Sequence, residues 1–497
     1  MNKKLFLVLL LLAAVVFTGC APREESLVIA IPTDPDGFHP HQSLAAASAE
    51  IAFNIYEGLV KAAPDGSVAP AIASSWEISS DGLVYTFTLR DGVRFHNGRL
   101  LEPADVVYCL SRVIDPDITG KAREFSAVET IEADGNDIVI TLSRPDAAFL
   151  ALLTEFGASI YPPEAEEHLS TQPVGTGPFV LTTWNPNNEL VLTRFEHYWN
   201  SELPMLDRVT LKIIPDPSTA VTSLRTGHVD LIPRLEPDYL HQVEDDESLV
   251  ILEGPMNLVQ LLVINNAREP FNTLEVRQAV AYAINRDEII QGAAWGRGTP
   301  IGSNMSPAMD AWYVDVTDTY AHDPQKARDL LAQAGYPDGF SAVIHLPAPY
   351  PLHRSAGEII VEQLAQVGID LEIQVVEWST WLEQIYSNSE FSLTVIGFTG
   401  KLDPHTVLGR YQSGSGRNFG NFNSPEYDQL LAQGLLETDF EARHQIYSRI
   451  QEILAEEVAG VFLMDPSQLV VMNKNLAGWQ NYPVYVLDLS TLHWQDR

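Results

Sequence analysis

Hydrophobic patterns along the first half of the chain predict strands joined by turns. Residues 26–33 form an apolar run that predicts an opening strand. Apolar positions alternate with polar ones over residues 85–95, near Asp-Gly pairs that favour tight turns, which predicts hairpins. Alternation over residues 209–213, helix-capping residues at 218–219 and a short strand at 229–231 predict a βαβ unit.

The second half of the chain alternates predicted helices and strands. Residues 323–335 carry a capping aspartate, a proline in first position, an apolar stripe and a closing glycine, which together predict a helix. Ser355 and Glu358 form a capping box that predicts the start of a second helix. Strands are predicted over residues 369–375 and 391–397. This order is typical of a wound α/β lobe.

The charge balance excludes one class of partner. The chain has 66 acidic and 30 basic residues, a net charge of −36. A phosphate backbone would be repelled, so we expect no nucleic-acid partner. A solvated acidic surface that keeps an exported protein soluble explains this charge, with adaptation to salt or alkali as the alternative. A length of 497 residues with 45% hydrophobic residues predicts a globular protein of several structural units.

The first twenty residues predict export. Lys3 and Lys4 precede an apolar run over residues 5–17, the pattern of a secretory signal peptide. This run is too short to cross a bilayer, which takes about 20 apolar residues. The small residues before Cys20 resemble a bacterial lipoprotein box, which predicts that Cys20 is lipidated and begins the mature chain. A generic signal peptide with an incidental cysteine is the alternative.

Cysteine usage and motifs argue against an enzyme. Cys109 is the only other cysteine and falls on the apolar face of a helical stretch, which predicts a core residue. The chain lacks a HExxH zinc helix, a GxxxxGK phosphate loop and a GxSxG nucleophile elbow. We therefore predict neither enzymatic activity nor a cofactor, although carboxylates meeting in a cleft would revive a hydrolase hypothesis.

Several stretches of the chain resemble, in the same order, the extracytoplasmic solute-binding proteins of ABC importers for peptides and nickel, sometimes called family 5. The similar stretches are YEGLV at residues 56–60, PAIASSWEISSDGLVYTFTLRDGVRFHNG at 70–98, VGTGPFVL at 174–181, Tyr198-Trp199, IIPDPSTAVTSLRTGHVDL at 213–231, VRQAVAYAINRDEII at 276–290, DPQKARDLLAQAGYPDG at 323–339 and NFNSPEYDQLL at 421–431. Most of them build turns, caps and core, so the resemblance is specific for the family but not for the solute.

The resemblance implies an α/β, two-lobed fold like that of periplasmic binding proteins, of the large type II class, with a hairpin-rich extra subdomain. The implied parts are a signal peptide at 1–20, lobe I at 21–50, 172–254 and 479–497, the extra subdomain at 51–171 attached to lobe I, and lobe II at 255–478. The chain would cross between the lobes near Met256 and near Trp479, and these crossings would form the hinge.

The same resemblance implies an extracytoplasmic receptor, anchored to the membrane by lipid. It would capture a short peptide or similar small solute between the lobes by hinge closure and deliver it to the permease subunits of an ABC importer. It would act as a monomer. Binding of nickel, of metal chelates or of another non-peptide solute, and solute sensing, are alternative functions.

One loop carries the main candidates for ligand contact. In peptide-binding relatives, a strand ending in glycine and an aromatic residue is followed by an acidic residue that pairs with the peptide ammonium. Gly397, Phe398 and Thr399 match that strand end. Lys401 stands where the acid is expected, and Asp403 comes two places later. Either Asp403 binds the amine, or Lys401 binds an anionic group of a different solute, or neither residue touches the ligand.

The remaining candidates are scattered. Arg354 stands where some relatives place a guanidinium for the ligand carboxylate, with a surface salt bridge as the alternative. Phe398 and Trp378 could wall the pocket, although aromatic residues at strands are more often core. His39 belongs to the segment 34–42, which is expected to face the cleft. Two histidines in a loop fall short of the three or four ligands of a tight metal site, so we predict no metal.

Overall fold

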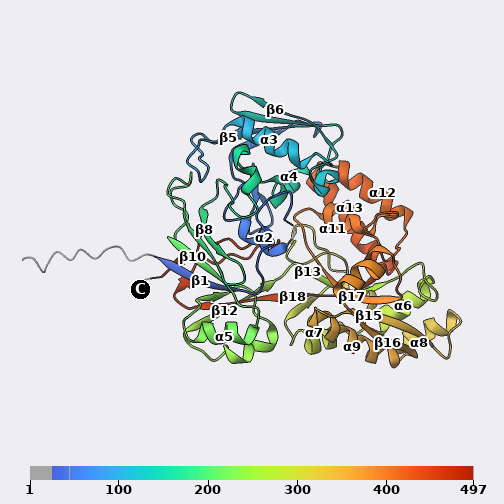
Figure 1. Cartoon of the computed structure of the whole chain (residues 1–497). Helices are drawn as coiled ribbons and strands as arrows, with labels where there is room; N and C mark the ends of the chain where they lie inside the picture. Colours follow the sequence, from blue (N-terminus) through green and yellow to red (C-terminus); the bar gives the residue numbers. More distant parts are fainter. Residues whose placement is uncertain (1–24, 44, 496–497) are drawn as a thin grey trace, which may run out of the picture.

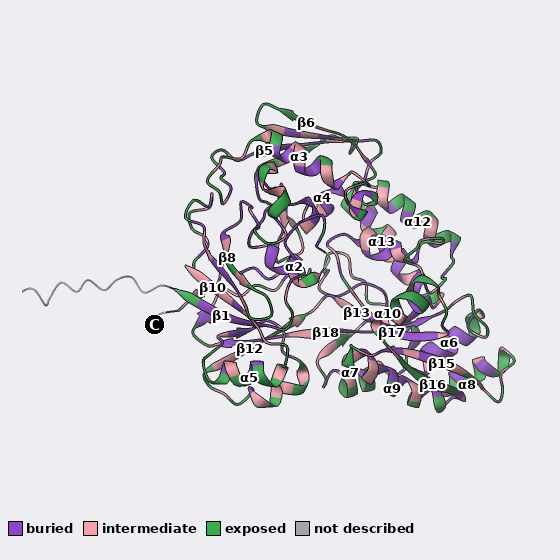
Figure 2. Ribbon diagram, viewed as in Figure 1, coloured by how far each residue is buried: buried purple, intermediate pink, exposed green. Residues whose placement is uncertain are grey.

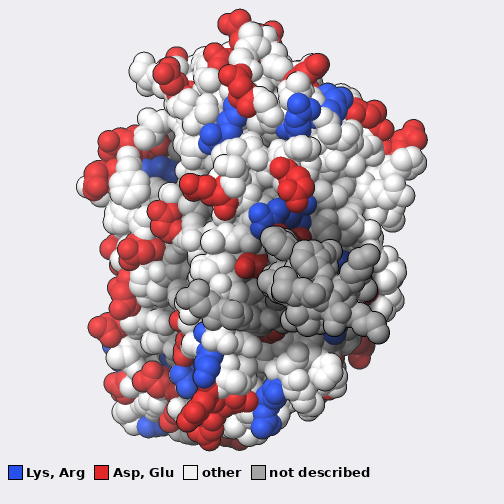
Figure 3. Space-filling model, turned by 90° about the vertical axis from the view of Figure 1, so that its left-hand side faces the viewer, with Lys and Arg blue, Asp and Glu red and all other residues white. Residues whose placement is uncertain are grey.

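The computed structural model describes residues 25–43 and 45–495. The predicted signal peptide and Cys20 lie outside the described residues. None of the described helices is long and apolar enough to span a membrane. On the face shown in Figure 3, acidic side chains are spread widely over the surface, in keeping with the net charge of −36.

A mixed sheet of twelve strands runs through the molecule (Figure 1). Ten of its strands follow the order β16-β15-β17-β13-β18-β11-β1-β10-β9-β8, while β12 and β14 also pair with β18. The strands are β1 (Ser26–Ile31), β8 (Phe179–Asn185), β9 (Glu189–Arg194), β10 (Arg208–Ile213), β11 (Leu231–Ile232), β12 (Leu249–Pro255), β13 (Leu258–Ile264), β14 (Gly298–Pro300), β15 (Phe340–Pro347), β16 (Ile369–Val376), β17 (Leu393–Thr399) and β18 (Gly460–Asn473).

Lobe I is built around β1, which lies parallel to both β10 and β11. Helix α5 (Pro217–Arg225) connects β10 to β11, and the side chain of Asp216 caps it by accepting the N–H of Thr219 at 2.8 Å. The predicted βαβ unit is therefore confirmed. The predicted caps at residues 218–219 are wrong, because both residues lie inside α5 and Asp216 caps it instead. Helix α2 (Ala46–Ala52) and the short hairpin of β2 (Val60–Ala62) and β3 (Val68–Pro70) follow the opening strand.

Lobe II is built around β13, whose apolar side chains point to both faces of the sheet. Leu262 and Ile264 pack on one face, and Leu261 and Val263 pack on the other. In Figure 1, α7, α8 and α9 lie below the sheet and α11, α12 and α13 lie above it. The helices of this lobe are α6 (Leu274–Ala283), α7 (Arg286–Ala293), α8 (Pro324–Gln333), α9 (Pro351–Ala365), α10 (Trp378–Thr380), α11 (Pro404–Leu408), α12 (Pro425–Leu436) and α13 (Phe440–Glu456).

Two helix starts in lobe II test the predicted caps. Helix α8 begins as predicted, because the side chain of Asp323 accepts the N–H of Lys326 at 2.9 Å. The predicted capping box of Ser355 and Glu358 is wrong. Helix α9 begins earlier, at Pro351, and Ser355 lies inside the helix. The fixed backbone angle of proline suits the first turn, so Pro351 marks the true start.

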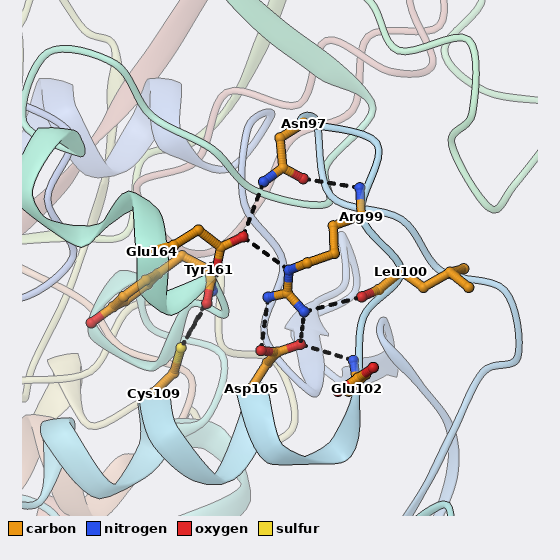
Figure 4. A network of polar contacts seen from close by, with 8 residues as sticks. All are labelled: Asn97, Arg99, Leu100, Glu102, Asp105, Cys109, Tyr161 and Glu164. Atoms are coloured by element: carbon orange, nitrogen blue, oxygen red, sulfur yellow. Dashed lines mark hydrogen bonds and ion pairs between the residues drawn. The ribbon is translucent and has the colours of Figure 1, made fainter.

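The extra subdomain is an antiparallel sheet covered by a helix. Its strands are β4 (Ala73–Ile78), β5 (Val84–Leu89), β6 (Val128–Asp134) and β7 (Asp137–Leu142), in the order β4-β5-β7-β6, with helices α3 (Pro103–Val113) and α4 (Phe149–Leu152). Arg99 holds the start of α3 through two hydrogen bonds of 3.0 and 2.8 Å to Asp105 (Figure 4). Cys109 on this helix is buried, and its thiol donates to the carbonyl of Tyr161 at 3.2 Å. The predicted core position of Cys109 is confirmed.

Buried residues fill the strands and the inner faces of the helices (Figure 2). A single apolar cluster joins lobe I to the extra subdomain, since Leu211 from β10 and Phe87 from β5 both belong to it. Shared packing of this kind stabilises the two as one unit. Lobe II has its own clusters on the two faces of its sheet.

The chain passes between the lobes at two adjacent places. Strand β12 leads into β13 through residues 255–258, and β18 runs the opposite way through residues 464–467. The first half of β18 pairs with β13 of lobe II, and its second half pairs with β12 of lobe I. The sequence placed the return crossing near Trp479. In the structure it lies well before that residue, at 464–467, because the one long strand β18 pairs with strands of both lobes.

Asp465 ties the two crossings together. It lies in β18, is 1% exposed, and its carboxylate accepts the backbone N–H groups of Met256, Asn257 and Leu258 at 3.2 Å each. The hydroxyl of Ser306 is a fourth donor. Burial raises the pKa of Asp465 to about 6 in spite of these hydrogen bonds.

Candidate solute-binding cleft

A cavity of about 380 Å³ lies where the two lobes and the extra subdomain meet. Lobe I and the extra subdomain line it with residues from the segments 46–62, 121, 151–159 and 484–490. Lobe II contributes residues from the loop 399–406. The volume falls in the range of small-molecule sites, which is about 300–1,000 Å³. Both lobes therefore border one space large enough for a small solute.

Glu57 forms a polar part of the cavity wall, within the segment 51–171 that the resemblance assigns to the extra subdomain. Its carboxylate accepts the hydroxyl of Tyr198 at 2.9 Å, the indole N–H of Trp199 at 3.0 Å and the hydroxyl of Thr176 at 3.0 Å. Burial raises the pKa of Glu57, and the charge of Lys61 opposes that rise. The sequence placed Glu57 in a family motif without predicting that it lines the cleft.

The predicted loop of lobe II does reach the cavity, through Thr399, Lys401 and Asp403. The ammonium of Lys401 lies 2.8 Å from a carboxylate oxygen of Glu155, so this ion pair joins lobe II to the extra subdomain. Asp403 is 5% exposed and receives two hydrogen bonds from Arg443, at 2.8 and 2.9 Å. Both charges are thus neutralised by partners within the protein.

Asp403 has a second structural task. Its carboxylate accepts the N–H of His405 at 2.8 Å and so caps helix α11. With two bonds from Arg443 and one from the cap, the Asp403 carboxylate already accepts three hydrogen bonds. A peptide ammonium at this place would compete with a buried, bidentate ion pair.

The other predicted contacts do not belong to the cavity lining. The ring of Phe398 lies 3.5 Å from the guanidinium of Arg410, and the backbone of Gly397 is packed against His353. Trp378 stacks on Trp381 with ring centroids 5.0 Å apart. Their contact with a solute stays a prediction.

Arg354 and His39 also lie outside the cavity lining. Arg354 is a half-buried residue of helix α9. His39 is 4% exposed, and one ring nitrogen lies 3.9 Å from a carboxylate oxygen of Glu166. Burial lowers its pKa, which favours the neutral ring. Within residues 25–43 and 45–495, no group of three or more histidine, cysteine, aspartate or glutamate residues could hold a metal ion.

Two cavity residues, Lys61 and Lys121, escaped the sequence analysis. Lys61 lies on β2 and Lys121 on a 3₁₀ helix, Gly120–Arg123. Burial lowers the pKa of Lys121; Glu155 raises it in turn, and the like charge of Lys401 lowers it. The chain has only eight lysines. Three of them line this cavity: Lys61, Lys121 and Lys401. Because lysine is so rare in this chain, each lysine could have been considered a candidate site residue from the sequence.

The model of a known family, described as bacterial extracellular solute-binding proteins, family 5 middle, matches residues 67–419. The chain belongs to this family. The predicted resemblance is confirmed, and so is the class of function, since members of the family bind solutes outside the cytoplasm for ABC transporters.

Relatives and solved structures support the assignment over nearly the whole chain. Heme-binding protein A of Haemophilus influenzae is 30% identical over 491 residues, covering 90% of this chain and 88% of the relative. Glutathione-binding protein GsiB of Escherichia coli K12 is 27% identical over 502 residues and 96% of each chain.

The structure of the periplasmic binding protein DppA of Helicobacter pylori in complex with the peptide STSA has a TM-score of 0.81 and 28% identity, with 95% of this chain and 98% of that chain covered. The structure of HbpA2 of Haemophilus parasuis has a TM-score of 0.85 and 26% identity, covering 95% of this chain and 100% of that one. The two-lobed fold is therefore confirmed.

Proposed function

We propose that this chain is the lipid-anchored receptor of an ABC importer and that it captures a short peptide between its lobes. The observation that carries this proposal is a cavity of about 380 Å³ that residues of both lobes line. A solute that touches both lobes stabilises their closed arrangement by its differential affinity for that state. A micromolar solute supplies about 8 kcal/mol, enough to bias a hinge of this kind.

The lining of the cavity is polar and carries charges of both signs, which suits a charged solute. The lining includes the carboxylates of Glu57 and Glu155 and the ammonium groups of Lys61, Lys121 and Lys401. A short peptide carries both kinds of charge. The known structure in complex with the peptide STSA supports a peptide as the solute class. The proposal includes no catalytic step and no cofactor, and it treats the protein as a monomer.

The experiment is a binding and scattering measurement on the mature protein. Titration calorimetry with a pool of tripeptides is expected to give saturable binding, and small-angle scattering is expected to show a smaller radius of gyration with the peptides present. Absence of binding by every tripeptide, or binding without compaction, would contradict the proposal. Native mass spectrometry of freshly purified protein identifies any solute that remains bound.

Three further measurements separate the finer parts of the proposal. Mass spectrometry of the mature N-terminus is expected to find a lipidated Cys20, and an unmodified start elsewhere would exclude the anchor. Uptake of labelled peptide into membrane vesicles that contain the cognate permease distinguishes import from sensing. Equilibrium dialysis with nickel and histidine tests the metal-chelate alternative.

A further inference from the structure

The carboxylates that line the cleft already have donors within the protein. Glu57 accepts from Tyr198, Trp199 and Thr176, and Asp403 is held by Arg443. Asp488 accepts the hydroxyl of Tyr482 at 2.8 Å and that of Ser490 at 2.7 Å. Glu155 is paired with Lys401. The four carboxylates that line the cleft therefore already have hydrogen-bond or ion-pair partners within the protein.

The ammonium groups of the cleft are in the opposite situation. Only Lys401 of the three lysines has an ion pair. Among the described residues, the ammonium groups of Lys61 and Lys121 have neither a hydrogen bond nor an ion pair within 4.0 Å. Both residues are half-buried, so their charges are partly removed from water. An unpaired ammonium in such a place gains from an anionic partner.

The neighbouring charges leave room for that partner. Glu124, which lies outside the cavity lining, is the other carboxylate that acts on Lys121 and Lys401, and burial raises its pKa. The carboxylate of Glu57 is occupied by its three neutral donors, so Lys61 balances it only through space. The outer surface of the protein is strongly acidic and repels anions. Anion binding in the cleft therefore requires local cations.

We propose that Lys61 and Lys121 receive side-chain carboxylates of the solute, so that the cleft selects short peptides with two acidic side chains over neutral or basic peptides of equal length. This selectivity rests on the proposed function and names its solute class. Ammonium groups without a hydrogen bond or a close ion pair are complementary to an anion. A cation would be repelled by them and would find the carboxylates of the cleft already paired.

The test is calorimetric binding of three tripeptides, Ala-Glu-Glu, Ala-Gln-Gln and Ala-Lys-Lys, to the mature protein. Ala-Glu-Glu is expected to bind about tenfold more tightly than Ala-Gln-Gln, because charge-assisted hydrogen bonds are roughly twice as strong as neutral ones. Ala-Lys-Lys is expected to bind most weakly. Lys61→Met and Lys121→Met should each weaken Ala-Glu-Glu about fivefold or more and leave Ala-Gln-Gln nearly unchanged.

Lys212→Met is the matched control. Lys212 lies on β10 outside the cavity lining, and its ammonium donates to the carbonyl of His228 at 3.3 Å. Its replacement should leave all three affinities unchanged. Thermal melting of each variant verifies that it is folded.

The outcomes separate this inference from the proposed function. Equal binding of the three tripeptides, or an affinity for Ala-Glu-Glu that survives both Lys61→Met and Lys121→Met, overturns the acidic selectivity while peptide capture stands. Failure of all three tripeptides to bind overturns peptide capture, and the selectivity with it.

Discussion

Asp403 of lobe II and Lys121 of the extra subdomain line the same cavity but differ in what holds them. Asp403 is enclosed by a bidentate partner and a helix cap. Lys121 has no such partner among the described residues, and burial lowers its pKa. The contrast teaches that a charged residue at a cleft is available to a solute only where the protein has not already neutralised it. Asp403 stabilises the fold, and Lys121 is free to bind.

Removing the partner of Asp403 is expected to have the largest effect. Arg443→Met leaves a carboxylate buried without its cation, which costs about 3–5 kcal/mol of unfolding free energy. Urea denaturation measures this loss. The control is Arg449→Met, whose guanidinium pairs with Glu426, Glu452 and Glu456 at the surface; that change should cost about 1 kcal/mol or less. Equal costs for the two variants would mean that Asp403 is available to a ligand after all.

Asp465, which lies in one crossing and bonds to the other, is a second carboxylate with all its partners inside the protein. Its contribution to the free energy of unfolding is expected to depend on pH. Its pKa of about 6 lies above the ordinary value of 3.8, so the native state binds the proton more readily than the unfolded chain does. The stability that this group contributes is complete below pH 3.8 and is lost as the pH rises through 6.

Relative to Asp465→Asn, which does not titrate, the wild type should therefore gain about 2–3 kcal/mol between pH 7 and pH 4. Chemical denaturation across this range measures the difference. A difference that does not vary with pH would show that Asp465 keeps an ordinary pKa.

The side chain of Lys121 can be moved by a substitution at a neighbouring residue, Gly157, while Lys121 itself is kept. A methyl group at Gly157 would lie 2.8 Å from Cδ of Lys121 and 3.1 Å from its ammonium nitrogen, so Gly157→Ala must move this side chain. We expect the affinity for Ala-Glu-Glu to fall about threefold to tenfold, the loss of part of one charge-assisted contact. Gly120→Ala is the control, because nothing lies within 4 Å of the added carbon. Identical affinities in both variants would contradict a role for the position of Lys121.

The ion pair across the cleft should matter least for stability. The side chain of Lys401 is 44% exposed, so Lys401→Met is expected to change the free energy of unfolding by about 1 kcal/mol or less. Thermal melting at low and high salt measures it. A loss of unfolding free energy as large as that of Arg443→Met would show that Lys401, like Asp403, contributes strongly to the stability of the fold.

Much of the fold could be predicted because its signals are local. The cap of Asp323 and the apolar face around Cys109 depend on residues a few places apart, and both were predicted correctly. The start of helix α9 was not, because two competing local signals, Pro351 and Ser355, lie only four residues apart. The crossing at Asp465 was missed because a buried strand that serves two lobes looks like any other apolar strand.

The sequence by itself determined the family, the order of strands and helices and the acidic character of this protein, and it predicts an export signal. These follow from motifs, periodicity and composition, which need no knowledge of distant contacts. Only the tertiary structure decided which charges of the cleft are occupied. Arg443 reaches Asp403 from 40 residues away, and Glu155 reaches Lys401 from 246 residues away. Hydrogen bonds and ion pairs act over a few ångströms of space, so partners so distant along the chain are identified only once it is folded.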